Sequence, residues 1–445
     1  MANGDIPRDL GDGLTLRWSQ VDDREGIATL TSNVFRDGED EPANAEMDTY
    51  IRALMSGDHP LITAEDFVVV EERTTGRMVA CSCLFRQTWR YGGIACSVGR
   101  PELVATDPAF RRRGLIRAIF GALHDRSDGR GDLAQAITGI PYFYRQFGYE
   151  YALDLGGERY VALSDIPDAP ADHPDAISLR EATEADLPFL SALYERACTH
   201  TLVSAVIPPD YWRFQLTTPP LSGDDWRLLI ITNAAAADLG FLNVQPFRSG
   251  ATFMVRQLEV ASGTGLLGLT LPVLRQLKRM APTLGSYKPL APVTEVNFRL
   301  GREHPWYEAL GQQLAPRGRP PYAWYVRLAD LPRFVWHIRP VLERRLESSI
   351  MAGYSGYLRL DFYRGGLRLC FVDGKLSQAG PWQPSDSDRD NNAAFPSLVF
   401  TQLLLGYRDL DALRAAYPDV RCHEQVEPLL RALFPAERSL VLPLD

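Results

Sequence analysis

One short pattern occurs twice in the chain, on either side of a linker rich in proline and aspartate. The linker, residues 164–174, has the sequence SDIPDAPADHP and little to bury, which is typical of a domain boundary. In residues 14–23 and 177–186 a leucine, an arginine and an aspartate recur at the same offsets. Each segment predicts a short strand and then a helix that opens with acidic residues. The repetition favours two related α/β domains in tandem.

The last part of the chain has a different pattern. Residues 357–362 and 367–372 flank Arg364-Gly365-Gly366, which predicts a hairpin, and helical stretches follow it. A chain of 445 residues is long enough for two to four domains of ordinary size. We therefore expect three domains, at residues 1–163, 175–328 and 331–445, of which the first two are α/β and the third is α+β.

Charge and cysteine usage exclude several classes of function. The net charge is -9 and the acidic residues are dispersed, which argues against a nucleic-acid partner. Six scattered cysteines indicate a reducing compartment, and neither they nor the seven histidines show metal-ligand spacing. Residues 1–10 lack the apolar core of a signal peptide, and the longest apolar stretch, 395–407, is too short to cross a bilayer. We expect a cytoplasmic protein without a metal and without membrane insertion.

The segment with the clearest chemistry is 103–117, with the sequence LVATDPAFRRRGLIR. It predicts a strand, a basic turn with a glycine, and an amphipathic helix. The amino end of a helix offers unpaired N–H groups and a favourable dipole to a diphosphate. The edge of the preceding strand can pair with an amide-rich arm, as an added strand would. Both features suit acyl-CoA, and a further strand ends at Gly139. The residues expected to bind it are Val104, Ala105, Thr106, Arg112, Arg113, Gly114, Leu115, Ile116, Arg117, Gly139 and Ile140.

Two motifs carry a resemblance to a known family. Residues 111–116, RRRGLI, resemble the acetyl-CoA signature of the GNAT superfamily of N-acetyltransferases, with Ile116 where the signature has a small residue. Residues 143–149, FYRQFGY, resemble a hallmark of the enhanced-intracellular-survival acetyltransferases. That resemblance implies two tandem GNAT-like mixed-sheet domains, the second degenerate, followed by a sterol-carrier-protein-like α+β domain. It also implies a homo-oligomer.

The resemblance assigns the catalytic roles. It implies that Tyr144 is the general acid, and Tyr142 is the alternative in the same aromatic cluster. A tyrosine, with a pKa of about 10, is protonated at neutral pH and can protonate a departing thiolate whose pKa is about 8.5. In the family the chain's terminal carboxylate is the base, which here belongs to Asp445. The family usually ends in an aromatic or bulky apolar residue, whereas this chain ends Leu444-Asp445.

The expected reaction is transfer of an acetyl group from acetyl-CoA to a primary amine by direct attack. The acceptor is a small molecule or a peptide, and aminoglycosides, polyamines, peptide N-termini and lysines all fit. An acidic stretch either attracts this cation or is a solvated loop. Its members are Asp37, Glu39, Asp40, Glu41, Glu46 and Asp48.

Two other functions compete with this one. The first is a non-catalytic acyl-CoA or lipid-binding protein with a weakened GNAT site, an interpretation that Ile116 and Asp445 keep open. The second is an oxidoreductase, because residues 263–268, GTGLLG, match a dinucleotide motif. That motif also needs an acid at a second strand end about 20 residues on, and residues 286–288 are Ser, Tyr and Lys. A remnant cofactor loop in the second domain is the better explanation.

Overall fold

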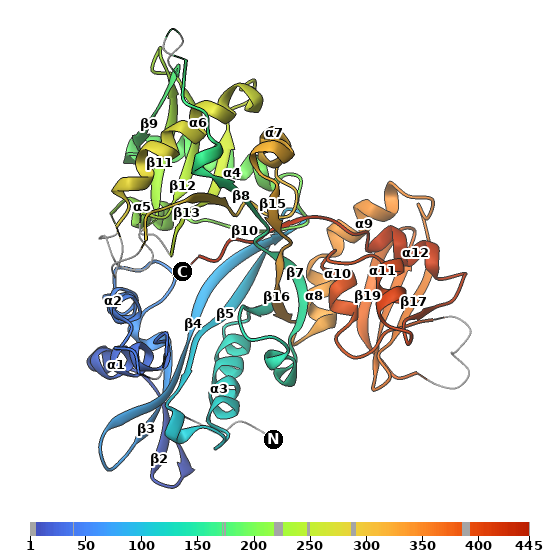
Figure 1. Ribbon diagram of the computed structural model, residues 1–445. Helices are drawn as coiled ribbons and strands as arrows, with labels where there is room; N and C mark the ends of the chain where they lie inside the picture. Colours follow the sequence, from blue (N-terminus) through green and yellow to red (C-terminus); the bar gives the residue numbers. More distant parts are fainter. Residues whose placement is uncertain are drawn as a thin grey trace.

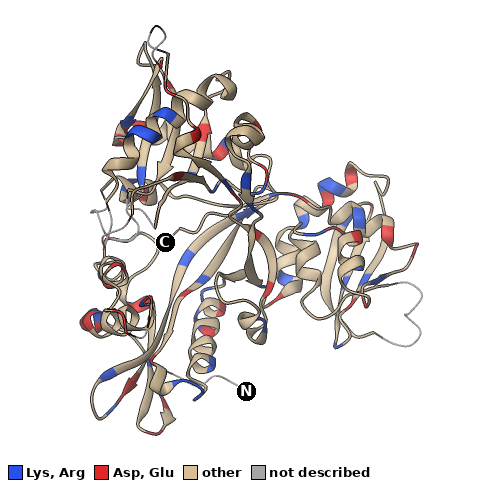
Figure 2. Cartoon of the chain, in the orientation of Figure 1, with Lys and Arg blue, Asp and Glu red and all other residues tan. Residues whose placement is uncertain are grey.

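The computed structural model describes residues 6–38, 40–170, 172, 175–217, 226–246, 250–285, 291–384 and 392–444. It has three units, each built on its own β-sheet (Figure 1). The two larger sheets are mixed and the third unit is α+β, so the predicted fold class is confirmed. Acidic and basic side chains are interspersed over all three units (Figure 2). No described helix is long and apolar enough to span a bilayer.

The first sheet has two long central strands, β4 and β5, and a layer of helices on each face. Its strands in spatial order are β1 (Arg8–Gly11), β2 (Leu14–Trp18), β3 (Phe67–Glu72), β4 (Arg77–Tyr91), β5 (Ile94–Thr106), β6 (Ala134–Ile137), β16 (Tyr322–Arg327) and β7 (Glu150–Leu155). Alternate residues of β3 point to opposite faces: Val68 and Val70 pack on α3 (Leu115–Gly129), and Phe67 and Val69 on the side of α1 (Arg24–Val34) and α2 (Ala45–Leu54). This period of two is what a doubly covered strand requires.

The second sheet repeats this plan. Its strands in spatial order are β15 (Arg317–Arg319), β8 (Glu158–Ala162), β14 (Glu295–Phe298), β13 (Thr252–Val260), β12 (Asp238–Val244), β11 (Arg227–Asn233) and β9 (Ile177–Glu181). Its helices are α4 (Leu187–Cys198), α5 (Pro209–Thr217), α6 (Leu266–Met280) and α7 (Pro305–Leu314). The short 3-10 helices of the two units are η1 (Val21–Asp23), η2 (Ala64–Asp66), η3 (Pro108–Phe110), η4 (Phe143–Phe147), η5 (Leu163–Asp165), η6 (Glu184–Asp186) and η7 (Ala281–Thr283).

The repeated sequence pattern has the same structure in both units. In the first, Arg17 at the end of β2 pairs with Asp23 at 2.6 Å, and in the second, Arg180 on β9 pairs with Asp186 at 2.8 Å. Each pair ties the end of a strand to the turn that starts the following helix. The order β2-β3-β4-β5-β6 corresponds to β9-β11-β12-β13-β14, and in both sets the last two strands are the parallel pair.

The two units exchange a strand. β16, which follows the second unit in sequence, lies between β6 and β7 in the first sheet. β8, which belongs to the first unit by sequence, lies between β14 and β15 in the second sheet. The predicted range 1–163 therefore contributes β8 to the second sheet, and the range 175–328 contributes β16 and the short strand β10 (Val203–Ala205) to the first. Both ranges remain a prediction.

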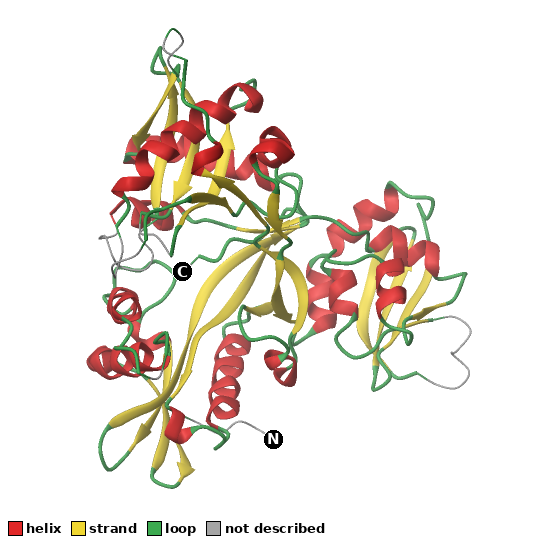
Figure 3. Cartoon of the chain, in the orientation of Figure 1, coloured by secondary structure: helices red, strands yellow, loops and turns green. Residues whose placement is uncertain are grey.

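The third unit packs helices against a five-stranded sheet (Figure 3). Its strands in spatial order are β19 (Lys375–Trp382), β18 (Gly366–Val372), β17 (Gly356–Asp361), β20 (Ala393–Ala394) and β21 (Arg421–Cys422). Its helices are α8 (Leu331–His337), α9 (Arg339–Glu347), α10 (Phe400–Leu404), α11 (Leu410–Ala416) and α12 (Glu427–Leu433). Pro340 lies in the first turn of α9, where its missing N–H costs nothing. Likeness to a sterol-carrier protein remains a prediction.

After α12 the chain returns to the other two units. The short strand β22 (Ser439–Leu440) pairs in parallel with β10 (Val203–Ala205), which itself pairs with β4. The indole N–H of Trp324 on β16 donates to the Val441 carbonyl at 3.2 Å. The last described residues consequently lie between the first and second units, where the carboxyl end is marked in Figure 1.

Candidate active site

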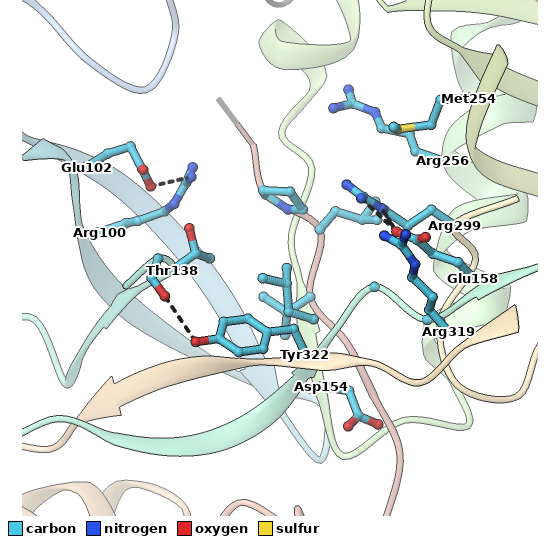
Figure 4. Close-up of a pocket in the computed structure, with 18 of the residues that line it drawn as sticks. Arg100, Glu102, Thr138, Asp154, Glu158, Met254, Arg256, Arg299, Arg319 and Tyr322 are labelled. Atoms are coloured by element: carbon cyan, nitrogen blue, oxygen red, sulfur yellow. Dashed lines mark hydrogen bonds and ion pairs between the residues drawn. The ribbon is translucent and has the colours of Figure 1, made fainter. Parts of the chain in front are cut away.

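A cavity of about 990 Å³ lies where the first unit, the second unit and the carboxyl-terminal segment meet (Figure 4). From the first unit it is lined by Phe35, Asn44, Glu46, Met47 and Tyr50 of the α1–α2 region, by residues 100 and 102–104 of β5, by residues 138–140 and by Tyr144. The other linings are residues 154–158, residues 439–443, and Trp226, Met254, Arg256, residues 299–301, Arg319, Pro320 and Tyr322.

Two neighbouring parallel strands separate beside this cavity. β5 pairs with β6 only through Val98–Ala134 and Gly99–Gln135, and β6 then turns to β16. Toward Thr106, β5 has no described strand partner on that side, so its backbone groups form an open edge. Leu103 sits in a bulge opposite β4 with φ of 56°, which bends this edge. Val104 lines the cavity at the same point.

The basic turn follows directly on β5. Gly114 is the N-cap of α3 with φ of 76°, and Arg112 has φ of 64°, so the turn uses left-handed backbone at both residues. The first backbone bond inside the helix runs from Ala118 N–H to Gly114 O at 3.2 Å. The N–H groups of residues 115–117 precede it and have no acceptor within the helix. Arg112 and Arg113 are exposed beside them, which makes this turn suitable for an anion.

The side chains of this segment differ in how deeply they are buried. Ala105 and Leu115 are buried in the core, so they offer only their backbone to a ligand. Arg117 is exposed, and its guanidinium lies over the Phe147 ring at 5.6 Å. Ile116 is partly buried and packs against two apolar clusters, one under α3 and one around Tyr144. Its branched side chain therefore packs against the apolar core.

Tyr144 lies on η4 with its side chain only 4% exposed, and it lines the cavity. A Cβ atom at Gly139 would lie 3.5 Å from the Tyr144 ring and 3.6 Å from its hydroxyl, so the ring covers Gly139. Tyr142 is 67% exposed and does not line the cavity. Of the two tyrosines proposed from the sequence, Tyr144 is thus the one that lines the cavity. Burial, and secondarily the charge of Glu102, raise the pKa of Tyr144 well above its ordinary value.

A cluster of tyrosine hydroxyls holds the end of the separated strand. The Tyr325 hydroxyl lies 3.0 Å from the Ile140 carbonyl oxygen and 2.7 Å from the Tyr151 hydroxyl. The Tyr322 hydroxyl donates to the Gly139 carbonyl at 3.1 Å. Tyr322 and Tyr325 both come from β16, so the exchanged strand positions Gly139 and Ile140. No sequence motif indicated these tyrosines, because their partner residues lie about 180 positions earlier in the chain.

The carboxyl-terminal segment is anchored in the cavity wall. The Leu444 carbonyl oxygen accepts a hydrogen bond from Gln87 Nε2 and another from Arg100 Nη1, both at 3.0 Å. The same Arg100 pairs with Glu102 at 2.7 Å. Asp445, the predicted base, lies outside the described residues.

The acidic stretch contributes little to the cavity. Of its described members only Glu46 is among the lining residues, and Asp48 is paired with Arg52 at 2.8 Å on the same helix. Glu39 lies outside the described residues. The GTGLLG segment, residues 263–268, runs from the loop after β13 into the first turn of α6, at the place that the basic turn has between β5 and α3, and it does not line the cavity.

Comparisons with known proteins agree with this geometry. The sequence model of the acetyltransferase (GNAT) domain matches residues 15–152. No curated protein matches the chain. Among solved structures, a probable N-acyltransferase from Enterococcus faecalis has a TM-score of 0.67 at 13% identity, covering 96% of this chain and 98% of its own. A GCN5-related N-acetyltransferase from Kribbella flavida has a TM-score of 0.61 at 16% identity, covering 97% and 98%. Eis1 from Mycobacterium abscessus has a TM-score of 0.56 at 15% identity, covering 96% and 98%.

At these identities the likeness to solved structures concerns the fold, and it extends over nearly the whole chain. The match to the domain family is independent of this likeness and covers the strands from β2 to β6, the basic turn and the tyrosine segment, but not β16. Residues 15–152 are therefore similar in sequence to an acetyltransferase (GNAT) domain.

Proposed function

We propose that the protein transfers an acetyl group from acetyl-CoA to a primary amine. One observation carries this proposal: the open edge of β5 and the side chain of Tyr144 line one cavity, and the amino end of α3 packs beside them. Val104, Ile116 and Tyr144 belong to the same apolar cluster, so the three elements are packed together. The predicted organisation, two GNAT-like domains and a sterol-carrier-like third domain in a cytoplasmic homo-oligomer, is part of the proposal.

The residues present fit acyl-CoA. The unpaired N–H groups of residues 115–117, with Arg112 and Arg113 beside them, would hold the diphosphate. The open edge at residues 104–106 would pair with the amides of the pantetheine arm. Ile116 leaves room for the diphosphate because its side chain packs into the core.

The reaction proceeds by direct attack. The amine nitrogen forms a bond to the acyl carbon, the carbon–sulfur bond breaks, and the backbone N–H near Val104 stabilises the negative charge that develops on oxygen. Tyr144 donates its proton to the departing sulfur. The proton that the ammonium must lose before attack goes to a carboxylate, for which we propose the terminal carboxylate at Asp445. It follows Leu444, whose carbonyl is held by Gln87 and Arg100.

The decisive test is release of free thiol from acetyl-CoA with a panel of amines, for the native protein and for Tyr144→Phe. Because a positioned acid contributes roughly 10²-fold or more, kcat is expected to fall by at least that factor. Tyr142→Phe is the matched control and should change kcat little, since that side chain is exposed. The raised pKa of Tyr144 also predicts no fall of kcat, through loss of this proton, below about pH 10.

Two other outcomes would argue against the proposal. If Tyr144→Phe keeps full activity, the acid has been misassigned. If no amine is acetylated although calorimetry shows acetyl-CoA binding, the protein is an acyl-CoA or lipid-binding relative without the chemistry.

A further inference from the structure

The wall that the second unit contributes to the cavity is strongly basic. Arg256 lies on β13, Arg299 follows β14, and Arg319 ends β15. Figure 4 shows the three guanidinium groups on one side of the cavity, across from Arg100 and Glu102. The sequence pattern did not indicate this wall, because the three residues come from different strands of a unit that carries no other expected chemistry.

Carboxylates balance only part of this charge. Glu158 pairs with Arg299 at 2.7 Å. Burial alone would raise the pKa of Glu158, but hydrogen bonds from Tyr160 and Arg299 lower this pKa below its ordinary value. The Glu158 carboxylate is therefore ionised. Asp154 accepts hydrogen bonds from Arg302 at 2.8 and 2.5 Å. Among the residues that the structure describes, neither Arg256 nor Arg319 has an acidic partner.

Arg256 is the more unusual of the two. It is only 7% exposed, and its Nε has no hydrogen-bond partner in the described part of the chain. Its guanidinium lies 4.0 Å from the centre of the Trp226 ring, which fixes its plane. A buried guanidinium with an unmet donor is costly unless an anion completes it. Planar guanidinium groups recognise carboxylate and phosphate oxygens well.

We propose that the acceptor is an amine that also carries an anionic oxygen group, a carboxylate or a phosphate. This inference rests on the proposed acetyl transfer. Arg256 and Arg319 bind the oxyanion on the second unit's wall, while the amine points across the cavity toward Tyr144. Glu46 and Glu102 line that side of the cavity, where Glu102 already balances Arg100 at 2.7 Å, so an ammonium meets less positive charge there than at the second unit's wall. The cavity thus selects a zwitterion and disfavours a polycation, which would meet the basic wall.

The test compares acceptors that differ only in their anionic group. The ω-amino acids and ω-amino alkyl phosphates are assayed against ω-amino alcohols of the same chain length, over several lengths. We expect kcat/KM to be roughly 10-fold or more higher for an anionic acceptor, mainly through KM, because a charge-assisted hydrogen bond is lost in the alcohol. Comparison of the carboxylate and phosphate series shows which oxyanion the wall prefers.

Substitutions at two arginines test whether the basic wall causes the preference for anionic acceptors. Arg319→Gln changes an exposed side chain and should abolish most of the preference, because it lowers kcat/KM for the anionic acceptors more than for the amino alcohols. Arg256→Gln should do the same, and Arg256→Lys, which keeps the charge, should restore part of it. Arg213→Gln on α5 is the matched control, since it removes an exposed arginine outside the cavity. It should leave the preference intact.

The outcomes separate this inference from the proposed function. Equal kcat/KM for alcohols and anionic amines would overturn the inference and leave acetyl transfer standing. If no amine is acetylated, calorimetric titration with the same ω-amino acids and phosphates shows whether the basic wall binds an oxyanion. Binding that weakens at least about 10-fold in Arg319→Gln, as loss of one charged contact predicts, supports the basic wall. Absence of binding, or equal binding of the alcohols, overturns it.

Discussion

At the scale of single residues, Ile116 shows how packing decides the meaning of a departure from a motif. In the sequence it stands where the acetyl-CoA signature has a small residue, which suggests crowding of the diphosphate. In the structure its side chain packs against the core under α3 and against the cluster around Tyr144. The backbone N–H of this residue remains at the amino end of the helix, so the binding role that we propose for it does not depend on the side chain.

The substitution Ile116→Ala tests this explanation. Because a partly buried isoleucine loses apolar contacts, we expect the free energy of unfolding to fall by roughly 1–2 kcal/mol, with little change in the Kd for acetyl-CoA. Ile119→Ala on the same helix, where the side chain is fully buried, should cost more stability. Chemical denaturation and calorimetry give the two quantities. An affinity for acetyl-CoA that rises 10-fold in Ile116→Ala would show that the side chain does crowd the site.

Candidate site residues could be predicted from the sequence where they belong to a short contiguous motif. The turn at residues 111–114 and the segment around Tyr144 are short contiguous motifs; Tyr144 lines the cavity, and the turn lies outside its lining and leads into α3, which packs against the cluster around Tyr144. Gln87, Arg256, Arg319 and Tyr325 were not found. Each matters through contact with residues far away in the chain, and no local pattern encodes such a contact.

At the scale of elements, the local sequence pattern also could not show that β8 and β16 are exchanged between the two sheets. β8 and β16 have ordinary strand sequences, and the Pro-rich linker that follows β8 marks a boundary in the sequence. Local pattern gives the position of a strand but not its partner. Because β16 lies between β6 and β7, the first sheet is continuous only when residues 322–327 are present.

A fragment of residues 1–163 should therefore fail to fold as an independent domain. Without β16, strands β6 and β7 lose their common neighbour, and β8 has no sheet to join. We expect weak near-ultraviolet circular dichroism, no cooperative thermal transition and no acetyl-CoA binding. Coexpression with residues 164–445 supplies the missing strand and should restore all three. A fragment that melts cooperatively on its own would show that β16 is dispensable to the first sheet.

At the scale of the whole molecule, the largest of the apolar clusters extends into all three units. It joins Leu30 of the first unit, Leu193 of the second, Trp324 of the exchanged strand and Leu430 of the third. The third unit also directs residues 439–444 back to the cavity, where β22 pairs with β10. The segment that follows the third unit thus supplies part of the cavity wall, although that unit lies far from the basic turn.

Because residues 439–444 lead the end of the chain to the cavity, the proposed base can be tested. Adding one glycine after Asp445 moves the terminal carboxylate by the length of a residue, roughly 3.5 Å, while the anchors on Leu444 are kept. If that carboxylate takes the ammonium proton, kcat should fall by about 10²-fold, and the rate should recover as rising pH deprotonates the amine in solution. Acetyl-CoA binding, measured by calorimetry, should not change.

Asp445→Asn completes this experiment, because it removes the side-chain carboxylate and keeps the terminal one. Unchanged kcat in Asp445→Asn, together with a loss in the extended chain, assigns the base to the terminus. The reverse result assigns it to the Asp445 side chain. Full activity in both variants would exclude Asp445 and direct attention to Glu46, the acid of the α1–α2 region that lines the cavity.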